Sequence, residues 1–413
     1  MDPDEMPPWL DEESPQPIDL TGGPPANEPD HLAHAALDMV HTRYSSYPKK
    51  SKRNIALILE LDRRWKDEIR LNLFDGQVYI RGAAVDDTSE TEIAIWIDRH
   101  YGIDASTVMV SEIVRLIATR HSYHPIRDYM AGLEWDGTER VKHLLRDFFG
   151  ADDTPLNRVL ARCFLVSCVA RVMVPGCKVD TVLILKGLQG KGKSEGFRAL
   201  ASDDWFSDSA IEMGHKDGYG ALNGVWIYEF GELDSLNRKE AATAKAFLSG
   251  RTDRYRPSYG RNFITQKRQT VIVGTTNEET FLKDATGSRR YWPVEVHDPD
   301  VEGIEKARDQ LWAEALQLYK EGWTWWLWET QADELRAASE VWRDVDVWDS
   351  EVRRWCQGRV FVTVFEVLDQ AIKMPADRMS KGAQMRVAKV LQAAGWRKCR
   401  QGIDRVSGWE PPE

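Results

Sequence analysis

The sequence predicts an α/β protein with a central, mostly parallel sheet that is covered by helices. Two observations predict this fold class. Between residues 181 and 298, short β-rich runs alternate with helical or loop segments, which is the pattern of a parallel sheet. A glycine-rich string at 187–194 stands directly between one such run and a helical segment, as in the P-loop type of α/β core.

Length and composition restrict the alternatives. The 413 residues suffice for roughly two to four domains, each with its own core. There is no run of about 20 apolar residues, so we expect no membrane span. The acidic, proline-rich start lacks the positive charge and apolar stretch of a secretory signal, and this favours a cytoplasmic protein.

The net charge of −11 comes mostly from residues 1–30. This segment holds nine acidic residues, eight prolines and no lysine or arginine, so the rest of the chain carries a net charge of −2. We predict a disordered acidic tail, because this composition offers too little apolar surface to fold. A solubilising arm is its expected role, and mimicry of DNA charge at a basic site is the alternative.

Periodicity and turn signals divide the rest of the chain. Residues 31–135 mix helical stretches with a hairpin-like segment and are predicted to form a small N-terminal α/β domain. The following parts are predicted as a helical layer (136–180), the P-loop core (181–298), a helical segment (299–350) and a terminal module (351–413).

The terminal module shows the order helix, short strand at 360–364, helix, helix at 381–395 and turn-rich hairpin. This order is typical of a winged-helix module. From Ser380 onward the chain has seven Lys or Arg against three Asp or Glu, so its end is locally basic. A nucleic-acid contact is one interpretation of this charge, and a solvated helix face is the other.

The strongest motif is GLQGKGKS at 187–194, which matches the pattern G-x-x-x-x-G-K-[ST]. Its glycines allow a tight backbone whose N–H groups, with the helix N-terminus, face the phosphates of ATP. Lys193 is predicted to contact the β and γ phosphates, and the Ser194 hydroxyl is predicted to bind Mg²⁺. The predicted nucleotide-binding residues are Gly187, Gln189, Gly190, Lys191, Gly192, Lys193 and Ser194.

A P-loop needs an acidic residue on a neighbouring strand, which holds the hydrated metal and polarises the attacking water. The apolar run 225–228 leads into Glu229, far enough after the P-loop for a crossover and one more strand. Glu229 is therefore the favoured carboxylate near the metal. Glu232 is the second candidate for the general base.

Two further positions extend this set. Asn277 follows a β-rich run, and ligands of open α/β sheets bind at the carboxyl ends of the strands, so it is predicted to orient the attacking water or contact the γ-phosphate. Arg289 and Arg290 precede another strand and are candidates for an arginine finger that reaches the nucleotide of a neighbouring subunit. A surface arginine pair is the alternative.

Residues 245–268 hold seven Lys or Arg and one acid, interleaved with aromatic residues. Basic groups contact phosphates and rings stack on bases, as in sequence-tolerant single-strand binders. We therefore predict a DNA-binding loop rather than a solvated charged turn. Its candidate contacts are Lys245, Arg254, Arg256, Tyr259, Arg261 and Lys267.

Several of these motifs, in this order, resemble the virulence-associated protein E family, whose members are encoded by phages and prophages and are similar to superfamily III helicases. The strings that carry the resemblance are WDGTER at 135–140, VPGCKVDTVLILKGLQGKGKS at 174–194, KAFLSGRTDRYRPSYGR at 245–261 and GTTNEETFLKDATGSRRYWPV at 274–294. The resemblance implies an AAA+ type ATPase domain that assembles as a ring, commonly a hexamer, and translocates on single-stranded DNA at a replication origin or fork.

The same resemblance implies a role for each matching position. By position, these are Walker A for Lys193 and Ser194, Walker B for Glu229 with Glu232, the sensor for Asn277, the finger for Arg289 or Arg290, and a DNA-contacting hairpin for 245–261. The two acids are adjacent in many ATPases but are separated here by two residues, so the choice of base stays open. Such helicases are often fused to a primase. Residues 1–135 show no primase carboxylate cluster, so we expect that the chain depends on a separate primase or only loads one.

The sequence thus predicts a ring-forming DNA helicase or translocase that uses ATP and Mg²⁺, acts on single-stranded or forked DNA and replicates a phage or mobile element in the host cytoplasm. The first alternative is a replication initiator or regulator that binds DNA, is switched by ATP and does not unwind processively. The second is a phosphotransferase that acts on a small molecule, which the basic, aromatic loop disfavours.

Overall fold

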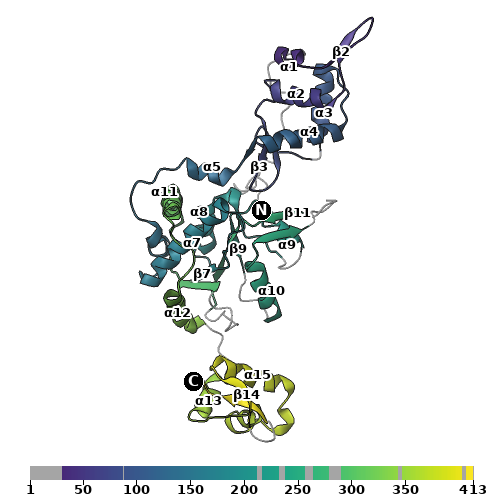
Figure 1. Cartoon of the computed structure of the whole chain (residues 1–413). Helices are drawn as coiled ribbons and strands as arrows, with labels where there is room; N and C mark the ends of the chain where they lie inside the picture. The colour runs from purple at the N-terminus through teal and green to yellow at the C-terminus, as the bar shows by residue number, and fades with distance from the viewer. Residues whose placement is uncertain are drawn as a thin grey trace, which may run out of the picture.

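The computed structural model describes residues 30–86, 88–211, 216–231, 238–255, 264–278, 290–342, 347–401 and 406–412. Figure 1 shows an N-terminal unit, a central unit with the large sheet, and a C-terminal unit. The predicted features that lie outside the described residues are the acidic tail to residue 29, Glu232, Arg256, Tyr259, Arg261 and Arg289. No helix in the described ranges combines the length and apolar character that a membrane span requires.

The N-terminal unit is a small sheet packed against helices. Its core gathers apolar side chains between Ala33 and Ala118. The helices are α1 (His31–Ala35), α2 (Lys52–Leu61), α3 (Ser89–Tyr101) and α4 (Thr107–Arg120). Strands β3 (Ile69–Asn72), β4 (Val78–Ile80), β5 (Ala83–Ala84) and β6 (Ser122–Tyr123) pair in the order β5-β4-β3-β6. A separate hairpin is formed by β1 (Met39–His41) and β2 (Ser46–Pro48).

The central unit is built on a five-stranded sheet with the order β13-β7-β12-β9-β8, in which every neighbouring pair is parallel. Its strands are β7 (Val182–Lys186), β8 (Phe206–Ser207), β9 (Ile227–Phe230), β12 (Val271–Thr276) and β13 (Tyr291–Glu295). The parallel sheet predicted between residues 181 and 298 is therefore confirmed. Along β7, Leu183 and Leu185 join one apolar core while Val182 and Ile184 join another, because successive strand residues face opposite sides.

The central unit also contains helices that come before, between and after these strands in the sequence. The described ones are α5 (Pro125–Ala131), α6 (Leu144–Phe149), α7 (Pro155–Met173), α8 (Lys193–Ala201), α9 (Lys216–Gly220), α10 (Arg238–Leu248), α11 (Val301–Lys320) and α12 (Glu329–Ala338). Side-chain caps define where the long ones begin: Thr154 accepts from Asn157 N–H at α7, and Asp300 accepts from Gly303 N–H at α11. The fully buried rings of Trp226, directly before β9, and Trp312 of α11 lie 4.2 Å apart between centroids and join the sheet to this helix.

The C-terminal unit has its own apolar core between Val352 and Trp409. Its elements are α13 (Asp349–Cys356), α14 (Val364–Glu366), the π-helical turn η6 (Val367–Ala371), α15 (Lys381–Ala393), β14 (Arg397–Gln401) and β15 (Val406–Glu410). The strand predicted at 360–364 is wrong: only Val362 pairs, in a single bridge with Trp409. Thr363 and Glu366 form a capping box instead, which turns the chain into α14.

Candidate functional site

The glycine-rich loop lies between β7 and α8, at the carboxyl edge of the parallel sheet. Gly190 and Gly192 adopt φ values of 74° and 86°, a left-handed conformation that favours glycine over residues with a side chain. Gly192 is the residue directly before α8, so the loop delivers the chain into the helix N-terminus. That terminus carries N–H groups without helical partners and a partial positive charge, which suits a phosphate group.

Lys193 starts α8, and its side chain folds back over the loop. Its Nζ donates to the carbonyl oxygens of Gly187 at 2.8 Å and Leu188 at 2.7 Å. The residue is buried, and this burial lowers the pKa of the ammonium group, although the charge of Glu229 acts in the opposite direction. The lysine is therefore a cation held within the loop itself, and its hydrogen-bond partners among the described residues are carbonyl oxygens.

Glu229 on β9 faces the first turn of α8 across the sheet edge. Its Oε1 accepts from Ser194 Oγ at 2.8 Å and from Thr275 Oγ1 of β12 at 2.5 Å, while its Oε2 is buried and has no hydrogen-bond partner among the described residues. Only 3% of the residue is exposed, and burial raises the pKa of its carboxyl group. The structure thus brings Lys193, Ser194 and Glu229 together as predicted from the sequence.

These groups fit a hydrated Mg²⁺. The metal prefers oxygen ligands and keeps several waters, so it needs only one or two groups from the protein. Ser194 Oγ supplies a hydroxyl oxygen, and the partnerless Oε2 of Glu229 supplies a buried acceptor beside it. Such a metal would neutralise charge on phosphate oxygens. Among the described residues, no group of three or more His, Cys, Asp or Glu is arranged to hold a metal ion.

Asn277 follows β12 and is exposed at the same sheet edge as the glycine-rich loop. It lines one cavity of about 230 Å³ together with Lys186 and Gly187 of the loop entrance and Val296 after β13. Ion pairs flank this cavity, because Lys186 bonds to Glu295 and Lys191 bonds to Asp298, at 2.8 and 2.9 Å. The structure therefore places Asn277 next to the loop, where a polar contact to a bound group is possible.

Arg290 lies at the opposite end of the sheet. It precedes β13, whose first residue pairs with the first residue of β7, and its Nε is 3.6 Å from Asp180 Oδ2. The glycine-rich loop follows the other end of β7. The length of β7, about 16 Å for five residues, therefore separates Arg290 from the loop of its own chain.

The predicted DNA-binding loop contains an antiparallel hairpin, β10 (Thr252–Tyr255) with β11 (Ile264–Lys267). Its base joins the amino end of β12, so it lies at the sheet edge opposite the glycine-rich loop. Arg254 and Lys267 are exposed on its two strands, and Lys245 is half-buried in the preceding helix α10. Of the six predicted contacts, these three are the ones within the described residues.

Arg268 is one of the seven basic residues of 245–268, but it has a different role. It is 1% exposed and pairs with Asp253, with Nε–Oδ2 and Nη2–Oδ1 distances of 3.0 and 2.5 Å, and its Nη1 donates to Phe247 O. Arg171 of α7, also buried, donates to the backbone of Val179 at 2.7 Å behind it. Burial lowers the pKa of Arg171 to about 10. This buried pair fixes the hairpin base instead of contacting a ligand.

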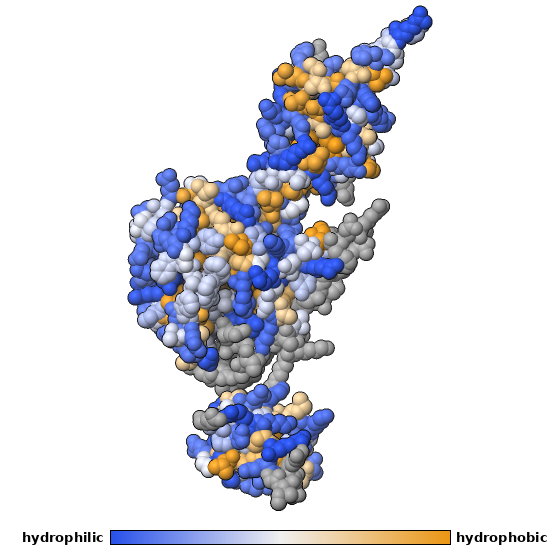
Figure 2. Space-filling model, in the orientation of Figure 1, coloured by the Kyte–Doolittle hydropathy of each residue, from blue (hydrophilic) through white to orange (hydrophobic). Residues whose placement is uncertain are grey.

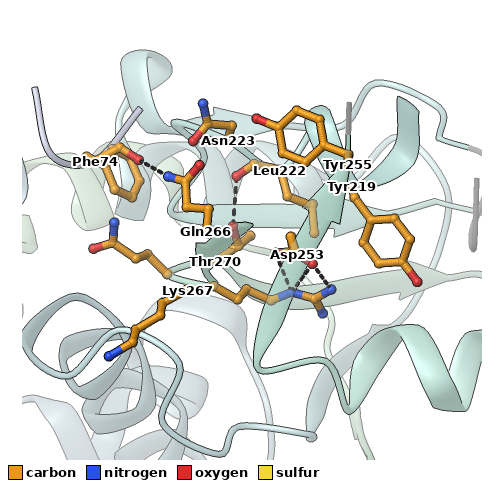
Figure 3. Close-up of a pocket in the computed structure, with 11 residues that line it drawn as sticks. Phe74, Tyr219, Leu222, Asn223, Asp253, Tyr255, Gln266, Lys267 and Thr270 are labelled. Atoms are coloured by element: carbon orange, nitrogen blue, oxygen red, sulfur yellow. Dashed lines mark hydrogen bonds and ion pairs between the residues drawn. The ribbon is translucent and has the colours of Figure 1, made fainter. Parts of the chain in front are cut away.

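The hairpin base also touches the N-terminal unit (Figure 3). The turn between β3 and β4 supplies two carbonyl groups: Gln266 Nε2 donates to Phe74 O at 3.1 Å, and Gln269 Nε2 donates to Leu73 O at 3.2 Å. His124, which is 4% exposed, contacts Gln269 Oε1 through Nε2 at 2.7 Å. Residues of two units therefore meet at the point where β11 leads into β12.

Sequence reasoning did not single out Thr275, Gln269, His124 or the Asp253–Arg268 pair. The string TTN held Thr275, but only the register of β12 against β9, with Val273 opposite Glu229, shows that its hydroxyl meets the carboxylate. Its place as the one acid in the basic run 245–268 was the only signal for Asp253.

Fold and site together define a mixed α/β protein with a parallel sheet and a glycine-rich loop and buried carboxylate at its carboxyl edge. The model of the virulence-associated protein E-like domain matches residues 130–343, slightly more than half of the chain. The chain belongs to this family, as the resemblance in the sequence indicated.

Comparison with solved structures gives only distant likenesses. Two apo structures of the NrS-1 C-terminal region (305–718) have TM-scores of 0.44 and 0.46 at 10% identity, and each match covers 83% of this chain and 95% of that one. A JCV helicase structure has a TM-score of 0.27 at 13% identity, with 60% of this chain and 78% of that chain covered. At these TM-scores the likeness carries no functional inference. No curated protein matches the sequence.

Proposed function

We propose that this chain is an ATP-dependent DNA helicase or translocase with an AAA+ type P-loop core of the superfamily III kind, acting in the replication of a phage or mobile element. The observation that carries the proposal is the cluster of Lys193, Ser194 and Glu229 at the sheet edge. In the proposed site, Lys193 leaves the loop carbonyls for the phosphates, Ser194 and Glu229 hold Mg²⁺, and Glu229 or Glu232 polarises the attacking water. Asn277 acts as the sensor of the γ-phosphate.

The path from the nucleotide to DNA is proposed to run along β12. Thr275 near one end of this strand bonds to Glu229, and the residues before its other end, Arg268 to Thr270, form the base of the β10–β11 hairpin. A strand inside a parallel sheet is stiff, so a shift at one end is transmitted over its length of about 20 Å. The hairpin, with Arg254, Lys267 and the predicted contacts Arg256, Tyr259 and Arg261, is the proposed DNA-binding element.

A ring of subunits, commonly six, is part of the proposal, and the position of Arg290 supports it. Because β7 separates Arg290 from the loop of its own chain, Arg290 or Arg289 would act as a finger on the nucleotide of a neighbouring subunit. Single-stranded or forked DNA is the proposed substrate, ATP with Mg²⁺ the cofactor, and a separate primase a further partner. A cytoplasmic location in the host is part of the same proposal.

One observation favours a second candidate, the ATP-switched initiator that binds DNA without processive unwinding. The described part of the C-terminal unit holds eleven Lys or Arg and six Asp or Glu. We propose a winged-helix role for this unit, with α15 as the helix that meets DNA and β14 with β15 as the wing. An initiator would rely on this unit and would hydrolyse ATP at a rate that single strands do not change.

ATP turnover and strand displacement on a forked DNA substrate test the proposal. Lys193→Ala should lower turnover by about 100-fold or more, because it removes the charge placed for the phosphates. Arg254→Gln should keep basal turnover but lose most of its stimulation by single-stranded DNA, since it lies on the hairpin and not at the loop. Arg336→Gln, an exposed arginine on α12, is the matched control and should behave as the parent protein.

Turnover that is insensitive to DNA, with no strand displacement, would leave the initiator as the better description. Turnover that survives Lys193→Ala would remove the proposed site altogether.

A further inference from the structure

We propose that the β1–β2 hairpin of the N-terminal unit is a second contact for single-stranded nucleic acid, separate from the β10–β11 hairpin. The turn between its strands, residues 42–45, forms the arm that projects beyond β2 in Figure 1. Figure 2 shows that the end of this arm is hydrophilic. Neither the glycine-rich loop nor the buried carboxylate takes part in this contact, so it goes beyond the function proposed above.

Positive charge is concentrated in the hairpin and in the segment that leads from it into α2. Residues 39–53 hold five Lys or Arg and no Asp or Glu, although the whole chain has a net charge of −11. Arg43 and Lys49 are exposed and form no ion pair with a carboxylate in the described part of the chain. The other three pair with carboxylates of neighbouring elements at mostly exposed positions, where solvent screens the attraction: Lys50 with Asp104, Lys52 with Glu112 and Arg53 with Asp38. A polyanion can therefore bind here and release its counterions.

Two tyrosine rings accompany these charges. Tyr44 is 90% exposed at the tip of the turn, directly after Arg43, and Tyr47 on β2 is 48% exposed. A single exposed aromatic residue is common and needs no explanation. Two rings among five cations match the way single-strand binders stack bases while cations contact the phosphates. Bases in a duplex are already stacked on each other, so exposed rings favour an unpaired strand.

The turn is held by its backbone and by Thr42, not by the tyrosines. Thr42 N–H donates to Ser45 O at 2.8 Å, and Thr42 Oγ1 accepts from Ser45 N–H at 3.0 Å. Ser46 Oγ lies 3.0 Å from His41 Nδ1, so the side chains of the paired residues next to the turn also contact each other. Tyr44 can therefore be truncated without loss of the turn, and its ring is presented on a preorganised support, which lowers the entropy cost of binding.

The test is the affinity of the nucleotide-free, full-length chain for a labelled oligothymidine, which has no secondary structure. Tyr44→Ala should weaken binding about 5- to 30-fold, the loss of one stacked base. Arg43→Gln combined with Lys49→Gln should reduce the slope of log affinity against log salt by about 0.7 per removed charge. Trp328→Ala is the matched control, because this ring is 60% exposed directly before α12, outside every proposed DNA-binding element, and its loss should not affect binding.

A photo-crosslink to oligothymidine that carries 5-iododeoxyuridine separates this contact from the proposed motor. The cross-linked peptide should contain Tyr44, also in the Lys193→Ala variant, so the result does not depend on ATP turnover. Unchanged affinity in both arm variants would overturn the proposal, and so would cross-links that map only to other segments. Vesicles containing phosphatidylserine test whether a lipid surface is the occupant instead. If Tyr44→Ala weakened binding to these vesicles but left the affinity for oligothymidine unchanged, the nucleic-acid assignment would be contradicted.

Discussion

Glu229 combines properties that a purely structural residue rarely has. It is almost fully buried, its Oε1 accepts two hydroxyl groups, and its Oε2 meets no donor among the described residues. An ionised carboxylate in such surroundings costs folding free energy, and a bound cation would offset that cost. We therefore expect Glu229 to lower the free energy of unfolding of the metal-free protein at neutral pH.

Glu229→Gln should raise thermal stability at pH 8 in the absence of Mg²⁺ and nucleotide. Burial raises the pKa of Glu229, so the folded state binds its proton more readily than the unfolded state does. The penalty is therefore absent below about pH 4.5, the ordinary value, and grows as the pH rises through the folded pKa. An increase in the free energy of unfolding of about 1 kcal/mol corresponds to an increase in Tm of about 2–4 °C.

The measurement is Tm against pH from 4 to 8, with Glu302→Gln, an exposed carboxylate on α11, as the control. A difference between Glu229→Gln and parent that does not grow with pH would contradict the stated cause.

At the scale of elements, the β10–β11 hairpin depends on a buried ion pair at its base. Asp253 lies between the exposed residues Thr252 and Arg254 on β10, and Arg268 directly follows the end of β11. The hairpin therefore presents Arg254 outward while it anchors Arg268 inward. Such pairs contribute little net stability compared with an apolar core, but removal of one partner leaves an uncompensated charge. The pair therefore holds the orientation of the hairpin relative to β12.

Asp253→Asn should lower the free energy of unfolding by about 3–5 kcal/mol, because Arg268 keeps its charge and loses its carboxylate in a buried position. Urea denaturation measures this loss. Glu302→Gln breaks an exposed pair with Lys306 on α11 and should change the free energy of unfolding by about 0.5 kcal/mol or less. Equal effects of the two substitutions would show that the buried pair has no special role.

At the scale of the whole molecule, hydrogen bonds join the N-terminal unit to the hairpin base. Arg127 N–H donates to His124 Nδ1 at 3.3 Å, so the neutral ring carries its proton on Nε2 and donates to Gln269 Oε1. Gln269 then donates to Leu73 O in the turn between β3 and β4. One neutral histidine therefore lies in a chain of hydrogen bonds that connects α5, the hairpin base and the N-terminal sheet.

This junction should weaken as the pH falls below about 6.5. Burial lowers the pKa of His124, with a smaller contribution of the same sign from Arg127, while the hydrogen bond to Gln269 is the largest opposing cause. The folded state thus prefers the neutral ring, and its stabilisation is present above the ordinary pKa of 6.5 and decreases below it. Protonated Nδ1 would also lose the ability to accept from Arg127 N–H.

Amide hydrogen exchange of residues 71–75, corrected for the intrinsic rate, measures this effect between pH 7.5 and 5.5. His124→Gln cannot titrate and should make protection independent of pH in this range. Protection that decreases equally in both proteins would assign the pH dependence to other groups.

Much of the candidate site could be predicted from the sequence, because its chemistry is local. The glycines, Lys193 and Ser194 are contiguous, and Glu229 and Asn277 each follow an apolar run. Strands of a parallel sheet end at a common edge, so these separate segments must meet there once the sheet forms. The short strand expected at 360–364 does not form, because the capping box of Thr363 outweighs the β-propensity of these five residues.

By itself, then, the sequence determined the parallel α/β core, the family and the composition of the glycine-rich loop with its carboxylate. Only the tertiary structure decided which charges are buried and which are exposed: Arg268 points inward to Asp253, whereas Arg43 is exposed on an arm. The physical reason is that motifs depend on neighbours along the chain, while the cost of burying a charge depends on partners that are distant in sequence and adjacent only after folding.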